Sequence, residues 1–328
     1  MIYATFLMRN DFFVPGALMY GYALKKQGIK DVYCFVTDDI SKRAVEFLHA
    51  VFDRVIEIDA VQVPHPNQKG RRDRGDLFTR FEVLKYYDDF DPLGQKILLA
   101  DSDILPLRNY KELANAPSPS AIINEKDAYT TRQENGQYVV DEPTLKTGQW
   151  HWHDRYSDYL NGAQIPAHIT DRVKDDPTNL GMNTSLWIFN TNMHDYTSIQ
   201  DDLRMPKTQA MVGTFNWPEM QYITQKWSGH WHTLDIKYAS FSGYPRLDLV
   251  NGIHFAGQKP WAITHKSFDH YSRFKDFRMW QSLFLTMLED TPILQTYPKL
   301  RRLADVFEEK FHKMPYTEEE ISHTPEWV

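Results

Sequence analysis

Apolar runs alternate with helical patterns along the first hundred residues. The runs have the length of buried strands, and they cover residues 2–8, 32–37, 54–58 and 96–100. A helical pattern extends from Pro15 to Gln27 and stops at Gly28, the order expected of proline at a helix start and glycine past its end. Ser41 can cap a second helix, and a third helical segment is expected near 78–87. This alternation predicts an α/β fold with a mostly parallel sheet, in which ligands bind beyond the carboxyl ends of the strands.

The second half of the chain is less regular. Residues 124–180 are polar and interrupted by glycine and proline, so we expect an insertion or lid at about 125–180. Further elements are expected as a strand at 185–189, helices near 192–204 and 217–228, a short strand at 253–256 and a helical tail after Ser267. The expected organisation is one domain over residues 1–265 and a helical extension packed on it over 266–328.

Composition narrows the classes of function. The chain has 328 residues, with 37 Lys and Arg against 44 Asp and Glu, and its net charge of −7 argues against a dedicated nucleic-acid-binding protein. No apolar run reaches about 18 residues, so membrane insertion is not expected. No signal-peptide pattern surrounds residues 2–8, which favours a cytoplasmic protein. The single cysteine, Cys34, lies in an apolar run and is interpreted as buried and inert, while the oligomeric state stays open.

Two carboxylates stand where a buried strand is expected to end. Asp101 and Asp103 follow the run at 96–100 and are separated by Ser102. Without a partner, their mutual repulsion and desolvation would be costly. A divalent cation held by oxygen ligands can use this arrangement and bridge to a diphosphate. A solvated turn after a strand would have the same pattern, so the motif alone leaves both interpretations open.

A second candidate for chemistry lies around residue 254. The imidazole of His254 can ligate a divalent metal, and Gly257 lets a ligand approach the backbone closely. Lys259 adds a positive charge suited to phosphate. By itself this segment is more typical of a core histidine followed by a turn.

Together these features resemble glycosyltransferase family 8, the glycogenin-like enzymes. The matching pieces occur in order between Tyr3 and Trp261, and the ordered set is specific although each piece is weak. The pieces are Thr5 to Asp11 with Pro15 to Leu18, Val51 to Ile58, Phe78 to Arg80, Asp101 to Asp103, Asn183 to Ser185, and His254 to Trp261. The resemblance implies a GT-A fold, Mn²⁺ as the cofactor with Mg²⁺ as a substitute, a UDP-sugar donor, and retention of configuration at the anomeric carbon.

The resemblance also implies roles for individual residues. The implied metal ligands are Asp101, Asp103 and His254. The residues implied to contact the donor nucleotide and diphosphate are Leu7, Asn10, Phe13, Arg80, Asp101, Ser102, Gly257 and Lys259. On the donor-sugar side, Glu219 and Gln221 replace the family's Asp-Gln pair, and together with Asn183 they are the candidate catalytic residues.

The implied activity is transfer of a hexose from a UDP-sugar to a hydroxyl of a glycan or a protein. UDP-glucose and UDP-galactose are the expected donors, and the insertion at about 125–180 is expected to shape the acceptor side. Two alternatives are a non-catalytic protein of the same fold that binds a nucleotide sugar or glycan, and a UDP-sugar hydrolase. Tyr238 and Tyr244 lie in a region where a self-glucosylating relative carries its acceptor tyrosine, although structural tyrosines are the better interpretation.

Overall fold

The structure is a computed structural model. It describes residues 1–66, 73–86, 94–123, 131–134, 137–140, 161–176, 181–242, 247, 250–262, 267–268, 271–272 and 274–311, with the backbone alone at 131–134, 137–140 and 311. Most of the insertion expected at about 125–180 lies outside the described residues, and so does Tyr244.

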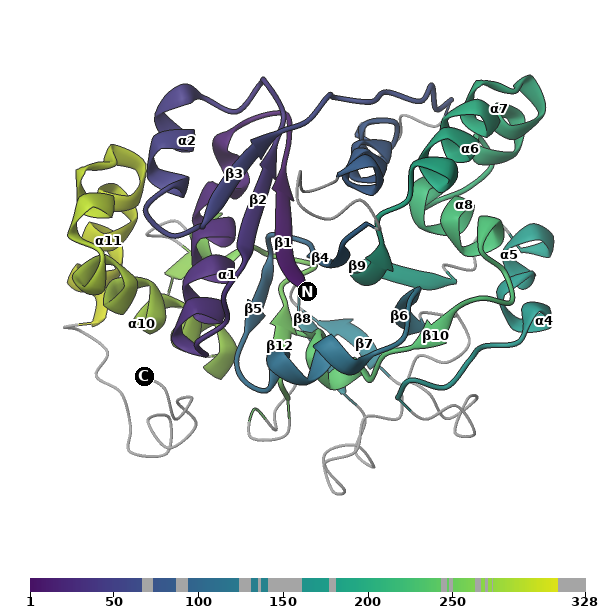
Figure 1. Ribbon diagram of the computed structural model, residues 1–328. Helices are drawn as coiled ribbons and strands as arrows, with labels where there is room; N and C mark the ends of the chain where they lie inside the picture. Colours follow the sequence, from purple (N-terminus) through teal and green to yellow (C-terminus); the bar gives the residue numbers. More distant parts are fainter. Residues whose placement is uncertain are drawn as a thin grey trace.

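Within the described residues, a seven-stranded mixed sheet forms the centre of the molecule (Figure 1). Its strands, in spatial order, are β10 (His232–Thr233), β6 (Ser120–Ile123), β9 (Met182–Asn190), β4 (Lys96–Ala100), β1 (Ile2–Leu7), β2 (Val32–Val36) and β3 (Arg54–Glu57). Strands β4, β1, β2 and β3 are parallel, whereas β9 is antiparallel to both of its neighbours, β4 and β6. The prediction of a mostly parallel sheet is confirmed, and the strand expected at 185–189 is its antiparallel member.

Strand side chains alternate between two hydrophobic cores, one on each face of the sheet. In β1, Tyr3 belongs to one core, while Ile2 and Ala4 belong to the other. In β4, Leu98 and Leu99 divide in the same way. Because these strands are buried on both faces, helices must cover both faces.

The helices form the two outer layers. One core is shared with α1 (Val14–Lys26), α2 (Lys42–Leu48), α10 (Lys275–Asp290) and α11 (Pro298–Phe311), which lie on the left in Figure 1. The other core is shared with the 3-10 helix η2 (Asp76–Lys85) and with α6 (Met193–Arg204), α7 (Pro206–Val212) and α8 (Pro218–Lys226). Two short helices, α4 (Ala167–Thr170) and α5 (Arg172–Asp175), precede β9 in the chain. In the described part of the chain, no helix combines the length and the apolar composition required to cross a bilayer.

Ser41 and Gly28 have the roles at helix ends that the sequence predicts. The hydroxyl of Ser41 accepts a hydrogen bond from the amide of Ala44 at 3.2 Å, which caps α2. Gly28 follows α1 with φ of 67°, a left-handed conformation that favours glycine. Cys34 is fully buried, and this burial raises the pKa of its thiol, in agreement with an inert side chain.

A second, smaller sheet was not predicted apart from its middle strand. It consists of β11 (Ser240–Phe241), β12 (Gly252–His254) and β5 (Ile104–Pro106), with β12 antiparallel to β5. A Cβ on Gly252 would lie within 3.0 Å of the Tyr110 hydroxyl and of the Tyr238 carbonyl oxygen, so glycine is required there for the strand to approach its neighbours. The backbone of β7 (Thr131–Glu134) and β8 (Gln137–Val140) forms an antiparallel pair within the expected insertion.

Candidate active site

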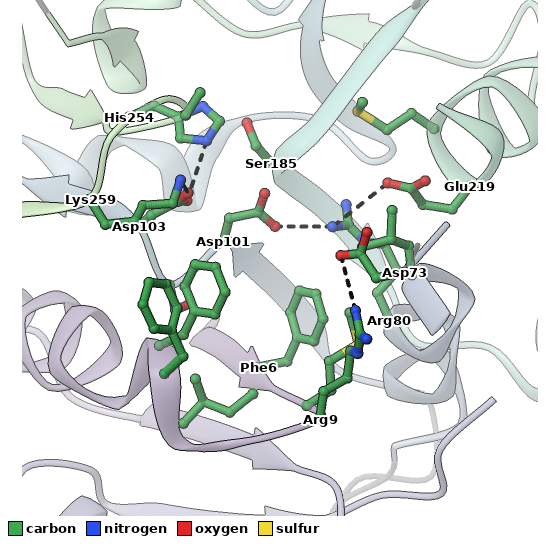
Figure 2. Close-up of a pocket in the computed structure, with 18 of the residues that line it drawn as sticks. Phe6, Arg9, Asp73, Arg80, Asp101, Asp103, Ser185, Glu219, His254 and Lys259 are labelled. Carbon is green, nitrogen blue, oxygen red and sulfur yellow. Dashed lines mark hydrogen bonds and ion pairs between the residues drawn. The ribbon is translucent and has the colours of Figure 1, made fainter. Parts of the chain in front are cut away.

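A pocket of about 610 Å³ lies at the carboxyl ends of β1 and β4 (Figure 2). Its wall also includes the first residues of β9, the start of α8 and the loop after β12. Because β9 runs antiparallel to β4, the beginning of β9 lies at the same edge of the sheet as the end of β4. Of the site residues that the sequence singled out, all except Gln221 line this pocket.

Asp101 and Asp103 occupy the turn between β4 and β5. The amide of Asp101 donates a hydrogen bond to the Ser185 carbonyl at 2.7 Å, and the amide of Ile104 donates back to the Asp101 carbonyl at 3.1 Å. These bonds hold the turn against β9 and place both carboxylates at the pocket wall. Asp103 is buried, whereas 28% of the Asp101 side chain is exposed.

His254 is brought to Asp103 by the pairing of β12 with β5. His254 lies opposite Ile104 in this pair, and the amide of Phe255 donates to the Asp103 carbonyl at 2.9 Å. Ligand atoms of Asp101, Asp103 and His254 all lie within 4.8 Å of one another, and we call these three residues the metal-ligand cluster. Two carboxylates and an imidazole form a donor set that suits Mn²⁺ better than a thiolate-seeking metal.

Lys259 forms an ion pair with Asp103. Its ammonium donates to the Asp103 carboxylate and to the Phe255 carbonyl, each at 2.6 Å. His254 Nε2 lies 3.3 Å from the other carboxylate oxygen of Asp103. Burial alone would raise the pKa of the Asp103 carboxyl, but the neighbouring Lys259 ammonium and the His254 side chain outweigh it and hold this pKa below its ordinary value. Asp103 is therefore a carboxylate at neutral pH.

Arg80, from η2, connects Asp101 to β9 (Figure 2). Its guanidinium donates to the Asp101 carboxylate at 3.0 Å, and to the carbonyl and hydroxyl of Thr184 at 3.0 and 2.6 Å. The Glu219 carboxylate lies 3.9 Å away on the other side, and the guanidinium stacks over Phe6 at 5.2 Å from the ring centroid. Arg80 is buried and held on several sides, so its charge is fixed in place.

Glu219 and Gln221 both lie in the first turn of α8, but the structure separates them. Glu219 is buried at the pocket wall. Gln221 is fully buried and is not among the pocket-lining residues, and its side-chain oxygen accepts a hydrogen bond from the Trp217 amide at 2.7 Å. This bond satisfies a backbone donor at the start of α8. Asn183 lines the pocket, and its side-chain oxygen accepts from the Ser185 amide at 3.0 Å.

The loop between β1 and α1 forms another part of the wall, with Leu7, Asn10 and Phe13. The Asn10 side chain accepts a hydrogen bond from the Phe12 amide at 2.8 Å and so caps the 3-10 helix η1 (Asp11–Phe13). Ser102 and Gly257 also line the pocket.

No protein-family model matches the chain. The chain is 21% identical over 310 residues to uncharacterized protein R707 of Acanthamoeba polyphaga mimivirus, across 88% of this chain and 95% of the viral protein. It is 30% identical over 118 residues to glycogenin of Neurospora crassa, across 35% of this chain and 17% of glycogenin. The glycogenin match confirms the resemblance to glycogenin-like enzymes that the ordered motifs indicate.

Two solved structures cover nearly the whole chain. The galactosyltransferase LgtC, in complex with donor and acceptor sugar analogues, is 12% identical with a TM-score of 0.50, across 98% of this chain and 100% of LgtC. The glycosyltransferase GlyE of Streptococcus pneumoniae TIGR4 is 11% identical with a TM-score of 0.50, across 95% of this chain and 64% of GlyE. The chain has the GT-A fold. The GT-A fold and the partial match to glycogenin together support a glycosyltransferase of the GT-A type.

The wall of this GT-A pocket contains residues that the sequence did not single out. Arg9 has φ of 72°, and its side chain forms ion pairs with Asp73 and Asp76 at 3.7 and 3.2 Å. These pairs join the loop after β1 to the start of η2 and to the residues just before it. Phe241, from β11, stacks on the His254 ring with 5.5 Å between ring centroids. No local pattern reveals such contacts, because each joins segments far apart in the sequence.

The structure supports a structural role for Tyr238. The side chain is buried, and its hydroxyl donates to the Glu112 carboxylate at 2.9 Å. Tyr238 is not among the residues that line the described GT-A pocket. This burial and this hydrogen bond agree with the interpretation of Tyr238 as a structural tyrosine.

Proposed function

We propose that this protein is a retaining glycosyltransferase that transfers a hexose from a UDP-sugar to a hydroxyl of a glycan or a protein, assisted by Mn²⁺. UDP-glucose and UDP-galactose are the proposed donors. The observation that carries the proposal is the convergence of Asp101, Asp103 and His254 on one pocket that also contains Lys259. The GT-A fold and the match to glycogenin support the class of enzyme.

The residues of the metal-ligand cluster fit a divalent cation. Among the described residues, the buried Nδ1 of His254 has no hydrogen-bond partner, and the carboxylates of Asp101 and Asp103 face the same pocket. Asp101, Asp103 and His254 would hold Mn²⁺, or Mg²⁺ in its place. When bound, the ion would favour the negative charge that develops on a departing diphosphate.

The side chain of Lys259 would act on the same leaving group. Lys259 lies at the pocket wall on a side chain that is 13% exposed, and its ammonium can reach a diphosphate as a point charge. Gly257, two residues earlier, leaves the backbone of this loop without a side chain facing the ligand. Leu7 and Phe13 would pack against the uracil, with Asn10 beside them. This distribution gives the pocket a nucleotide end and a diphosphate centre.

Glu219 and Asn183 would form the sugar end. Glu219 contributes a buried carboxylate beside Arg80, and such a group can stabilise the positive charge of an oxocarbenium-like sugar. Retaining hydrolases use a carboxylate nucleophile close to the anomeric carbon. For this chain we propose instead that the acceptor hydroxyl attacks from the face that the diphosphate leaves, which also retains configuration.

The proposal is tested by release of UDP from UDP-glucose, UDP-galactose, UDP-GlcNAc and UDP-xylose, with Mn²⁺ or with EDTA. The comparison is between wild type, Asp103→Asn, and the control Asp290→Asn at the exposed end of α10. We expect release from one donor that requires Mn²⁺, disappears in Asp103→Asn and persists in Asp290→Asn. Turnover should rise when a sugar or peptide acceptor is added, and the anomeric proton of the product should show retained configuration by NMR.

Other outcomes separate the alternatives. Mn²⁺-dependent binding of UDP without release from any donor would support a non-catalytic binding protein. A rate that no acceptor increases would support a UDP-sugar hydrolase. Absence of both release and UDP binding would overturn the donor site itself.

A further inference from the structure

Each carboxylate of the metal-ligand cluster already has an internal cation beside it. Arg80 donates to Asp101 at 3.0 Å, and Lys259 donates to Asp103 at 2.6 Å (Figure 2). Both cations are largely buried, with side chains 4% and 13% exposed. Ion pairs this protected from water are only weakly screened by salt.

The charges at this point nearly balance without any ligand. Two carboxylates, Asp101 and Asp103, face two cations, Arg80 and Lys259, and the buried Glu219 carboxylate, 3.9 Å from Arg80, brings the sum to about −1. A divalent cation added alone would leave an excess of about one positive charge in a partly buried place, which is unfavourable. A diphosphate brings at least two negative charges and restores the balance. The metal and the diphosphate should therefore bind together more readily than either binds alone.

The two internal cations differ in their freedom to move. Arg80 is fixed by two hydrogen bonds to Thr184 and by its contact with Phe6. Lys259 lies on the loop after β12, and in the described structure its ammonium has two hydrogen-bond acceptors, Asp103 and the Phe255 carbonyl. Its flexible stem allows the ammonium to leave Asp103 for a nearby anion, whereas the Arg80 guanidinium cannot move without breaking the contacts to Thr184.

We propose that Lys259 is an internal counterion: its ammonium pairs with the Asp103 carboxylate that would otherwise bind the metal. In the absence of nucleotide it opposes the entry of a divalent cation. When a diphosphate arrives, Lys259 moves to it and releases Asp103 to the metal, so the two ligands bind with positive cooperativity. This inference rests on the proposed function, because it assigns a coupling between the two ligands of that same site.

The test measures Mn²⁺ affinity from the EPR signal of unbound Mn²⁺, with and without saturating UDP. For the wild type we expect UDP to lower the Kd for Mn²⁺ at least tenfold. We expect Lys259→Met to bind Mn²⁺ alone at least tenfold more tightly than the wild type, and UDP to lower that Kd by a smaller factor than in the wild type. Because coupling is reciprocal, Mn²⁺ should tighten UDP binding by the same factor in calorimetry.

Two control variants test whether the positive charge beside Asp103 is what weakens Mn²⁺ binding. Lys259→Arg keeps a cation beside Asp103 and should bind Mn²⁺ alone as weakly as the wild type. Lys26→Met removes a positive charge from the surface of α1 and should leave both affinities unchanged. If Lys259→Met fails to fold, Lys259→Gln provides the same comparison, because its amide can still donate to Asp103.

The outcomes distinguish this inference from the proposed function. If Lys259→Met binds Mn²⁺ alone no more tightly than the wild type and only loses UDP affinity, Lys259 is a simple diphosphate ligand. That result overturns the inference and leaves the proposed function intact. If the wild type binds neither Mn²⁺ nor UDP, the proposed function fails and the inference fails with it.

Discussion

The amide of Phe255 donates a hydrogen bond to the carbonyl of Asp103 at 2.9 Å. This bond joins segments about 150 residues apart and extends the antiparallel pair of β5 and β12 by one step. As a result, the His254 side chain lies beside the Asp103 carboxylate, at 3.3 Å. The metal-ligand cluster therefore depends on the register of this small sheet as much as on its three side chains.

Gly252→Ala should disturb this register. The added Cβ would meet the Tyr110 hydroxyl and the Tyr238 carbonyl, and backbone cannot yield as a flexible side chain can. Overpacking of this kind costs about 1–3 kcal/mol, and we expect urea unfolding to show a loss in that range together with weaker Mn²⁺ binding. Gly213→Ala is the milder comparison, since its Cβ would lie 3.1 Å from the Pro66 side chain and 3.2 Å from the Gln209 carbonyl oxygen, whereas both contacts at Gly252 would be shorter than 3.0 Å. Equal stability of the two variants would contradict the prediction.

Asp11→Ala should weaken nucleotide binding without removing the metal site. The Asp11 carboxylate accepts hydrogen bonds from the amide and hydroxyl of Ser41, at 2.9 and 2.6 Å, and from the Tyr297 hydroxyl at 3.3 Å. These bonds fix the loop that carries Asn10 and Phe13 against α2 and the segment before α11. We expect a rise of several-fold in the Kd for UDP in calorimetry.

Tyr297→Phe removes only one of these hydrogen bonds and should have a smaller effect on UDP affinity. Mn²⁺ binding without UDP should stay at the wild-type level in both variants. A change in Mn²⁺ affinity equal to the change in UDP affinity would mean that Asp11 supports the whole pocket and not the loop alone.

Arg80→Ala should be strongly destabilising. It would leave the Asp101 carboxylate and the Thr184 groups without their shared donor inside the pocket wall. Removing one partner of a buried ion pair costs about 3–5 kcal/mol, and the partial exposure of Asp101 reduces this figure, so we expect about 2–3 kcal/mol in urea unfolding. Arg80→Lys keeps the charge but loses the planar guanidinium that donates to Asp101 and Thr184 at the same time, and it should retain part of the stability. Wild-type stability in Arg80→Ala would show that Arg80 serves ligand binding only.

The stability of the metal-free protein should depend on pH through Asp103. Despite the opposing effect of burial, Lys259 and His254 hold the pKa of this carboxyl below its ordinary value of 3.8. A carboxyl with a lowered pKa in the folded state stabilises the protein above its unfolded-state pKa, and this contribution is lost as the pH falls toward the folded-state pKa. The difference in the free energy of unfolding between wild type and Asp103→Asn should be largest above about pH 4 and shrink below it. Urea unfolding at pH 7, 5 and 3 measures this difference, and a constant value would refute the assignment.

The sequence determined much of the framework by itself. Strands β1, β2, β3 and β4 and helices α1 and α2 were predicted near their observed positions, because apolar spacing and end signals such as Ser41 and Gly28 act within a few residues. The closeness of Asp101 and Asp103 was also predictable, since one residue separates them after a buried strand.

Tertiary structure decided how these pieces meet. The antiparallel direction of β9 brings Asn183 and Ser185 to the carboxyl ends of the parallel strands, and nothing within β9 encodes its direction. Glu219 and Gln221 are two residues apart, yet only Glu219 faces the pocket, while Gln221 bonds to the start of its own helix. The contact between His254 and Asp103 depends on the register of β12 against β5. Periodicity along the chain reports which face of an element is buried, whereas these contacts depend on packing between distant segments.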